Sequence, residues 1–285
     1  MLLSLLLVIA SGLTHAIWSL FTKCSRNKSV FLWSIVMGST IVLLPSLIHE
    51  LWRQPLSVSA YFLILLSAAC QAVYALLLTQ TYKMGDLSQV YPIMRGTSTL
   101  LIPIGGVLFL HESLSLYGWI GLLCMVCGFV FLSGIWGGRQ IKLTAPAARK
   151  PFLMALLVGV TSTCYVFVDK LNLQHISATS LLEVTNIGFV AGLTPLVLKS
   201  REIQAEWKQN RWIILLGTIL NPGSYLLFLF AIQHAPVAHI SPVREIGTLF
   251  ATLLGIVILK EDQGLRRITC SILITAGIML IGLFG

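Results

Sequence analysis

The chain has 285 residues, of which 56% are hydrophobic and only 10% charged. Soluble domains carry about a quarter charged residues, so this composition excludes an ordinary water-soluble protein. The formal net charge of +9 would suggest nucleic-acid binding in a soluble protein, but nearly all the Lys and Arg stand in short segments between apolar runs. That pattern is typical of membrane topology signals. We therefore expect an integral protein of the lipid bilayer with no nucleic-acid partner.

Apolar stretches of membrane-spanning length recur along the whole chain. Because the hydrocarbon core is roughly 30 Å thick, a spanning helix needs about 20 apolar residues. The sequence predicts an all-α membrane protein with ten transmembrane helices, at 2–21, 30–49, 58–82, 87–110, 115–136, 151–169, 177–198, 212–234, 236–259 and 267–284. The first stretch lacks a basic n-region and a small-residue cleavage site, which indicates a retained helix rather than a signal peptide.

Two joins between helices are short. The charge-free stretch from Trp212 to Val243 is too long for one span and is expected to break at His234-Ala235-Pro236, with the proline in the first helical position. Earlier in the chain, Asp86 and Gln89 form a predicted capping pair at the start of the fourth helix.

The polar stretch near the middle of the chain divides two related halves. We predict a first repeat at 1–136, a cytoplasmic linker at 137–150 and a second repeat at 151–285. A shift of about 149 residues superposes the less common residue types of the two halves: Arg95 on Arg244, Gly106 on Gly255, Glu112 on Glu261 and Gly128 on Gly277. Near the start of each half, a slightly different shift pairs Lys23 with Lys170. The matches indicate an internal duplication.

The distribution of basic residues tests this duplication independently. Five helices per half would place the second half upside down in the membrane, so equivalent loops should exchange their basic residues. They do: the odd-numbered loops hold 15 Lys or Arg and the even-numbered loops hold two. By the positive-inside rule the odd loops are cytoplasmic and both termini lie outside. We therefore expect two inverted five-helix repeats.

The end of each half carries the most specific motif. The first half reads Pro103-x-x-Gly106-x-x-x-x-Leu110-His111-Glu112, and the second reads Gly255-x-x-x-Leu259-Lys260-Glu261. With this motif the whole chain resembles the EamA-type members of the drug/metabolite transporter superfamily, although glycine is usual there at His111 and Lys260. The resemblance implies inverted repeats, a central cavity lined by helices 1, 3, 4, 6, 8 and 9, and export or exchange of small metabolites across the inner membrane.

Two arginines stand inside predicted spans and are the leading site candidates. Arg95 and Arg244 lie roughly 13 Å from the starts of their helices, where a charge is costly. Pro92 and Pro242 precede them and are expected to open the helices by removing backbone hydrogen bonds. An arginine fork at such an interrupted helix suits a substrate carboxylate or phosphate. The alternative is that each arginine is a permanent partner of a protein carboxylate, for instance Arg244 with Glu245 or Glu183.

Other polar and aromatic residues on these helices complete the predicted site. Glu183 would relay protons if unpaired and be inert if paired with an arginine. His15 and His239 are candidates for substrate or proton binding, with packing as the alternative role. Aromatic and amide side chains offer a wall for an amphipathic substrate: Trp18, Tyr74, Tyr91, Tyr165, Tyr225 and Asn221.

These features predict a secondary transporter of a small amphipathic metabolite, such as an amino acid or related carboxylate. Proton or counter-substrate coupling is expected, in a monomer or homodimer. Two alternatives remain at this stage: a non-transporting scaffold or flippase accessory subunit, and an intramembrane lipid-modifying enzyme. We expect no enzyme, because no G-x-S-x-G, H-E-x-x-H or paired-aspartate motif occurs and the acidic residues are few and scattered. No metal or cofactor is expected either, because Cys124 and Cys127 lie in an apolar run without further ligands.

Overall fold

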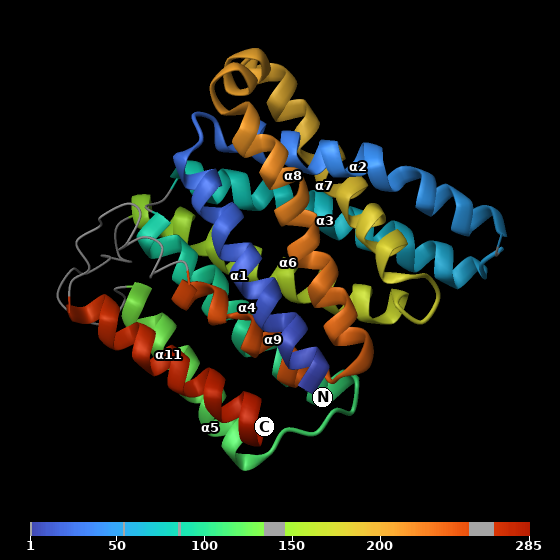
Figure 1. Ribbon diagram of the computed structural model, residues 1–285. Helices are drawn as coiled ribbons and strands as arrows, with labels where there is room; N and C mark the ends of the chain where they lie inside the picture. The colour runs from blue at the N-terminus through green and yellow to red at the C-terminus, as the bar shows by residue number, and fades with distance from the viewer. Residues whose placement is uncertain (1, 54, 85–86, 134–145, 251–264) are drawn as a thin grey trace.

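A computed structural model describes residues 2–53, 55–84, 87–133, 146–250 and 265–285. The described chain is helical throughout, with the helix labels of Figure 1: α1 (Leu2–Cys24), α2 (Lys28–Arg53), α3 (Val58–Met84), α4 (Leu87–Phe109), α5 (Leu116–Ser133), α6 (Pro146–Asn172), α7 (Ala178–Ser200), α8 (Ile203–His234), α9 (Val237–Arg244) and α11 (Leu265–Phe284). Among the described helices, eight are long and apolar enough to cross a membrane. The prediction of an all-α integral membrane protein is confirmed.

The two short joins differ in part from the prediction. The break before α9 is confirmed, since Ala235 is extended with φ −148° and ψ 161°. Pro236 is the N-cap, so the helix begins at Val237, one position later than expected. The predicted Asp86–Gln89 capping pair includes residue 86, which lies outside the described residues.

The ninth predicted helix is interrupted. α9 ends at Arg244, Glu245 forms a turn whose N–H bonds to the Pro242 carbonyl at 3.0 Å, and helical residues resume at 246. The predicted opening beside Pro242 is therefore present. The one predicted beside Pro92 is wrong, because α4 runs unbroken from Leu87 to Phe109.

The polar segment before the eighth span is helical rather than a loop. α8 begins at Ile203 and contains a kink at Asn210, where φ is −121° and ψ is 20°. Within this short first part, Glu206 is fully buried and accepts a hydrogen bond from the Asn27 backbone N–H at 2.8 Å. The acidic side chain thereby supports the start of α2, where a negative charge complements the unpaired N–H groups.

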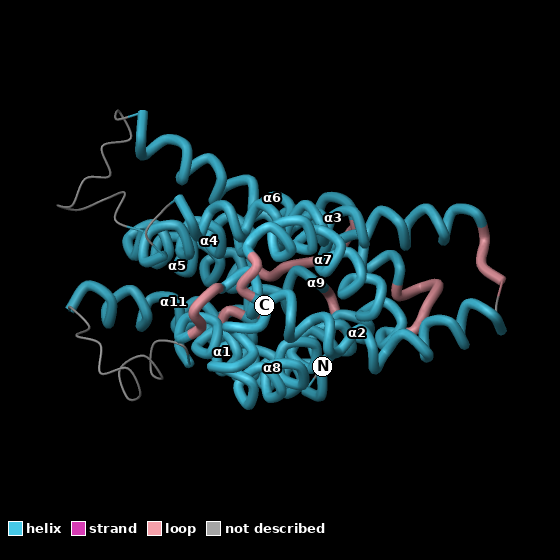
Figure 2. Tube along the Cα trace, turned by 90° about the horizontal axis from the view of Figure 1, so that it is seen from above, coloured by secondary structure: helices cyan, strands magenta, loops and turns pink. Residues whose placement is uncertain are grey.

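The halves pack on each other with two-fold pseudosymmetry. α2 packs on α7, α4 on α9 and α5 on α11, while α1 packs on α8 as α6 does on α3. Exchanging the first half for the second reproduces each of these pairs. Figure 2 shows α3 and α6 on one side of the molecule and α1 and α8 on the other. Close helix contacts obey the same pseudosymmetry. A Cβ atom added at Gly128 would contact the Cys270 carbonyl oxygen, and a Cβ atom added at the equivalent Gly277 would contact the Gly121 carbonyl oxygen.

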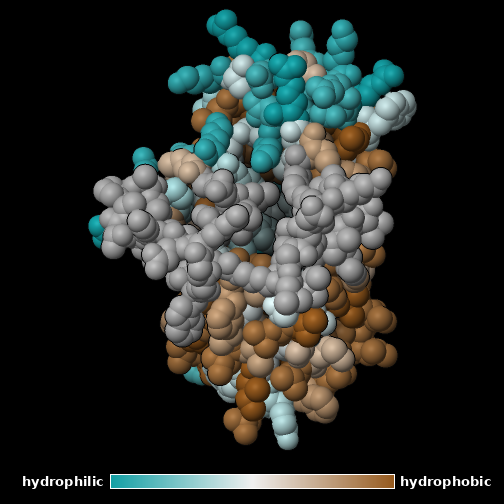
Figure 3. All heavy atoms as spheres, turned by 90° about the vertical axis from the view of Figure 1, so that its left-hand side faces the viewer, coloured by the Kyte–Doolittle hydropathy of each residue, from teal (hydrophilic) through white to brown (hydrophobic). Residues whose placement is uncertain are grey.

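Helix caps at opposite ends of the bundle reveal the inversion. Glu50, near the end of α2, accepts from the Ser177 N–H at 2.7 Å and thereby caps α7. At the other end Glu206, which follows α7, caps α2. Figure 1 shows the α1–α2 and α7–α8 turns at one end and both termini at the other. Figure 3 shows hydrophilic residues gathered over the first of these ends and hydrophobic residues over much of the remaining visible surface.

The EamA-type motif of the first half builds a third cap between the halves. His111 adopts a left-handed conformation with φ 53°, which explains why glycine is usual there. The Glu112 carboxylate then accepts from the Val237 and Ala238 N–H groups at 2.8 and 2.7 Å. The motif therefore joins the end of the first repeat to α9. Its second copy, with Glu261, lies outside the described residues.

Candidate functional site

Two adjoining hollows form a central cavity between the halves. They have empty volumes of about 760 and 680 Å³, which include open solvent, and they share His15, Trp18, Leu32, Tyr74, Leu78 and Arg95. The first also reaches Tyr91, and the second reaches Tyr165, Asn221, Tyr225 and Arg244. Nine of the eleven predicted site residues thus line it. α2 and α7 line it too, besides the six helices that the family resemblance implied.

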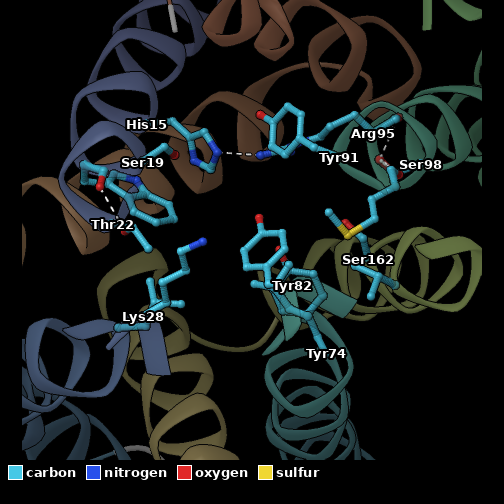
Figure 4. A pocket seen from close by; sticks show the side chains of 15 residues that line it. His15, Ser19, Thr22, Lys28, Tyr74, Tyr82, Tyr91, Arg95, Ser98 and Ser162 are labelled. Atoms are coloured by element: carbon cyan, nitrogen blue, oxygen red, sulfur yellow. Dashed lines mark hydrogen bonds between the residues drawn. The ribbon is translucent and has the colours of Figure 1, made fainter. Parts of the chain in front are cut away.

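The first hollow lies toward the end of the bundle that holds the α1–α2 turn. Its lining there includes Thr22 and Lys28, with Tyr82 and Tyr91 from α3 and α4. Figure 4 shows the Lys28 ammonium directed into the space beside Tyr82. Lys28 makes no ion pair or hydrogen bond with the described residues. From the sequence we interpreted Lys28 as a topology signal, because it precedes the predicted span.

Arg95 connects three helices at the centre of the cavity. One guanidinium nitrogen lies 3.3 Å from a carboxylate oxygen of Glu245, and another lies 2.5 Å from His15 Nε2. The guanidinium also stands over the Tyr91 ring at 5.4 Å. Because an arginine can only donate, His15 must accept through Nε2 in this contact. The alternative of a protein carboxylate partner therefore applies to Arg95, whereas no ion pair joins Arg244 to Glu245 or Glu183 among the described residues.

Arg244 is a partly buried cation without a carboxylate partner among the described residues. Its Nε donates to Ser11 Oγ at 3.1 Å, and its guanidinium lies 4.5 Å from the Phe228 ring centre and 5.5 Å from that of Tyr225. The aromatic faces favour the cation but do not neutralise it. The remaining N–H groups of the fork are available to an anion in the cavity, which Arg244 lines.

Aromatic side chains form the wall of the deeper hollow. Tyr165 lies edge-on to Tyr74 at 5.3 Å and to Tyr225 at 6.0 Å between ring centres. On the facing side, Trp18 stands against His15 at 4.7 Å, and its buried indole N–H has no partner in the part of the chain that the structure describes. An unpaired donor on a cavity wall suits a hydroxyl or carboxylate oxygen of a bound solute.

The structure places two predicted site residues away from the cavity lining. His239 Nε2 contacts the Ser113 carbonyl oxygen at 2.9 Å, toward the α4–α5 turn. It stands five positions before Arg244, so the two point about 140° apart around the helix. Glu183 is fully buried on α7, and neither of its carboxylate oxygens has a hydrogen-bond partner among the residues that the structure describes. It is adjacent in sequence to Leu182, which does line the cavity.

Asp169 and Lys170, behind the deeper hollow, were not recognised as part of the site. The Asp169 carboxylate accepts from Ser67 Oγ at 2.5 Å and from the Tyr225 hydroxyl. The Lys170 ammonium donates to the carbonyl oxygens of Ile232 and Ala235 at the end of α8. The prediction ended the sixth helix at residue 169, whereas α6 continues to Asn172. This difference moves both residues from a helix end into the helix.

The comparisons with known proteins agree with this architecture. The model of the EamA-like transporter family matches residues 2–134 and again 149–283. A "Probable glucose uptake protein GlcU" of Bacillus cereus is 27% identical over 68% of this chain and 69% of its own. A "Putative sugar uptake protein" of Lactobacillus johnsonii is 22% identical over 91% of this chain and 92% of its own.

A solved crystal structure shares the fold. It aligns over 99% of both chains with a TM-score of 0.76 and 16% sequence identity, which supports the architecture alone. The family model covers nearly all of the chain in two copies, as the internal repeat predicted. The protein is a multi-pass membrane transporter and belongs to the EamA-like transporter family.

Proposed function

We propose that this protein takes up a small sugar acid by alternating access and binds the solute's carboxylate at Arg244 in the central cavity. The observation that carries the proposal is the charge of the cavity. Lys28, Arg95 and Arg244 line it, and among the described residues only Arg95 is paired with a carboxylate, that of Glu245. A buried cation without a partner is costly, and an anionic solute supplies the missing charge.

The sugar part of the proposal has two supports. The two curated relatives carry names that state sugar or glucose uptake. The cavity also presents hydroxyl and amide groups beside aromatic rings, among them Gln71, Asn221 and Tyr225. Such a surface suits a sugar ring, which has polar edges and an apolar face. A hexuronate, a hexose oxidised to a carboxylate at one carbon, combines both chemistries.

Access to the cavity supports a state open to one side. The first hollow reaches Lys28 and Tyr82 near the ends of α2 and α3. The opposite end is held together by Glu112 on the start of α9 and by Lys170 on the end of α8. The pseudosymmetry implies a second state in which the two ends exchange roles, as inverted-repeat transporters do.

Orientation and location follow from the loop charges. The accessible end is that of the odd-numbered loops, which the positive-inside rule assigns to the cytoplasm. We therefore interpret this state as inward-open in the cell's inner membrane, with both termini outside. The names of the relatives state uptake. We therefore propose uptake in place of the export or exchange that the family resemblance implied.

Counterflow into proteoliposomes tests the function. Vesicles containing the purified protein are loaded with unlabelled galacturonate and glucuronate and diluted into the labelled compounds, with glucose and galactose as matched neutral sugars. We expect transient accumulation of a labelled hexuronate that exceeds that of its neutral counterpart. Faster counterflow of glucose would instead support the second candidate, neutral sugar uptake, which the names of the relatives favour. Exclusion of all four sugars would refute both candidates.

A further inference from the structure

A buried carboxylate lies next to the binding cavity without a cation of its own. Asp169 is fully buried, roughly 13 Å from the near ends of α3 and α8 as judged by its partners Ser67 and Tyr225. It makes no ion pair with the described residues. A charge in such a place is costly, whereas a protonated carboxyl is not.

The groups that face Asp169 come from each helix packed on α6 at this level. α3 contributes Ser67 and the Cys70 thiol one turn later, and α8 contributes Tyr225. On α6 itself, Lys170 is directed to the carbonyl groups at the end of α8. α4 meets α6 through Gly105 against Phe167, which adds no charge.

Tyr225 connects this carboxylate to the cavity. Its hydroxyl donates to Asp169, while its ring lies 5.5 Å from the Arg244 guanidinium and lines the deeper hollow. The positive charge of Arg244 therefore favours ionised Asp169 as long as the cavity is empty. An anion bound at Arg244 cancels that field and favours protonated Asp169.

We propose that Asp169, held between Ser67 and Tyr225, is the proton-binding site through which a proton gradient drives solute uptake. The inference rests on the proposed function and adds its coupling ion. Because linkage is reciprocal, a solute anion that promotes proton binding is itself bound more tightly when the proton is present. Proton and anion then enter together.

The same cluster links proton binding to the outer end of the bundle. Ionised Asp169 accepts two charge-assisted hydrogen bonds that tie α3, α6 and α8 together. Such bonds are roughly twice as strong as neutral ones. Protonation turns the carboxyl into a donor, reverses one hydroxyl and weakens the clamp. Opening to the outside is therefore favoured with a proton bound, and release to the inside restores the closed clamp.

The experiment compares Asp169→Asn with Glu206→Gln, which removes another buried carboxylate that lies outside the cavity lining and caps α2. Labelled galacturonate and glucuronate are followed in proteoliposomes, first in counterflow without a gradient and then with an inward proton gradient. For Asp169→Asn we expect counterflow to persist and gradient-driven accumulation to disappear. Glu206→Gln should retain both. Gradient-driven accumulation by Asp169→Asn at the wild-type level would overturn the inference.

A measurement on the wild-type protein covers the case of a variant that does not fold. A pH-sensitive dye inside the vesicles reports whether an inward hexuronate gradient carries protons with it. Internal acidification that depends on hexuronate supports the inference. Its absence in vesicles that show hexuronate counterflow would overturn the proton site and leave the proposed function standing. A lack of counterflow by wild-type protein would overturn the function and the coupling together.

Discussion

Arg244→Gln separates solute binding from folding. In the unliganded protein this arginine makes one hydrogen bond, to Ser11, and lies over the Phe228 and Tyr225 rings. No described carboxylate is ion-paired with it, so the change should alter the free energy of unfolding by less than about 1 kcal/mol. A lost charge-assisted hydrogen bond to a solute carboxylate costs about 1.5–3 kcal/mol. Binding should therefore weaken roughly 10- to 150-fold.

Arg95→Gln is the matched comparison. It removes the partner of Glu245, whose side chain is 8% exposed, and leaves that carboxylate buried and unpaired. Losing one partner of a buried pair costs about 3–5 kcal/mol. Arg95→Gln should therefore melt well below wild type, and adding Glu245→Gln should recover much of the loss.

Thermal melting in detergent and calorimetric titration with galacturonate measure the two effects separately. The reasoning would be refuted if Arg244→Gln bound galacturonate as tightly as wild type. It would also be refuted if Arg244→Gln lowered the melting temperature as far as Arg95→Gln does.

Three further expectations concern other parts of the molecule. Glu112→Gln weakens the cap on α9, so the free energy of unfolding should fall by about 1–2 kcal/mol and the melting temperature should fall with it. An unchanged melting temperature would contradict the capping role of Glu112. Trp18→Phe removes an indole N–H that has no partner among the described residues, on a side chain that lines the cavity. Hexuronate affinity should therefore drop severalfold while unliganded stability holds, and equal affinity would show that no solute uses that donor. A C-terminal alkaline phosphatase fusion should be active and a C-terminal green fluorescent protein dark, and the reverse pattern would invert the proposed orientation.

The helices and the two repeats were predictable from the sequence for a physical reason. Lipid requires each span to be apolar and long, so spans are visible in composition alone. The charge flip between equivalent loops added the inversion, which the caps at Glu50 and Glu206 reflect. The helical segment before the kink at Asn210 was missed, because its polar residues resemble a loop.

The candidate site was predictable in its position and less so in its contacts. A mid-bilayer arginine with a repeat-related counterpart pointed to the cavity, which both Arg95 and Arg244 line. Spacing along one helix does not say which arginine meets Glu245, because that contact joins α4 to the turn after α9. Asp169 was missed since its importance lies in Ser67 and Tyr225, which are distant in sequence.

A structure of the protein with galacturonate bound tests the central claim most directly. We predict the solute carboxylate within hydrogen-bond distance of the Arg244 guanidinium, with the sugar ring against the wall formed by Tyr165 and Tyr225. Galacturonate bound in the cavity with its carboxylate away from Arg244, or bound only outside the cavity, would contradict the account.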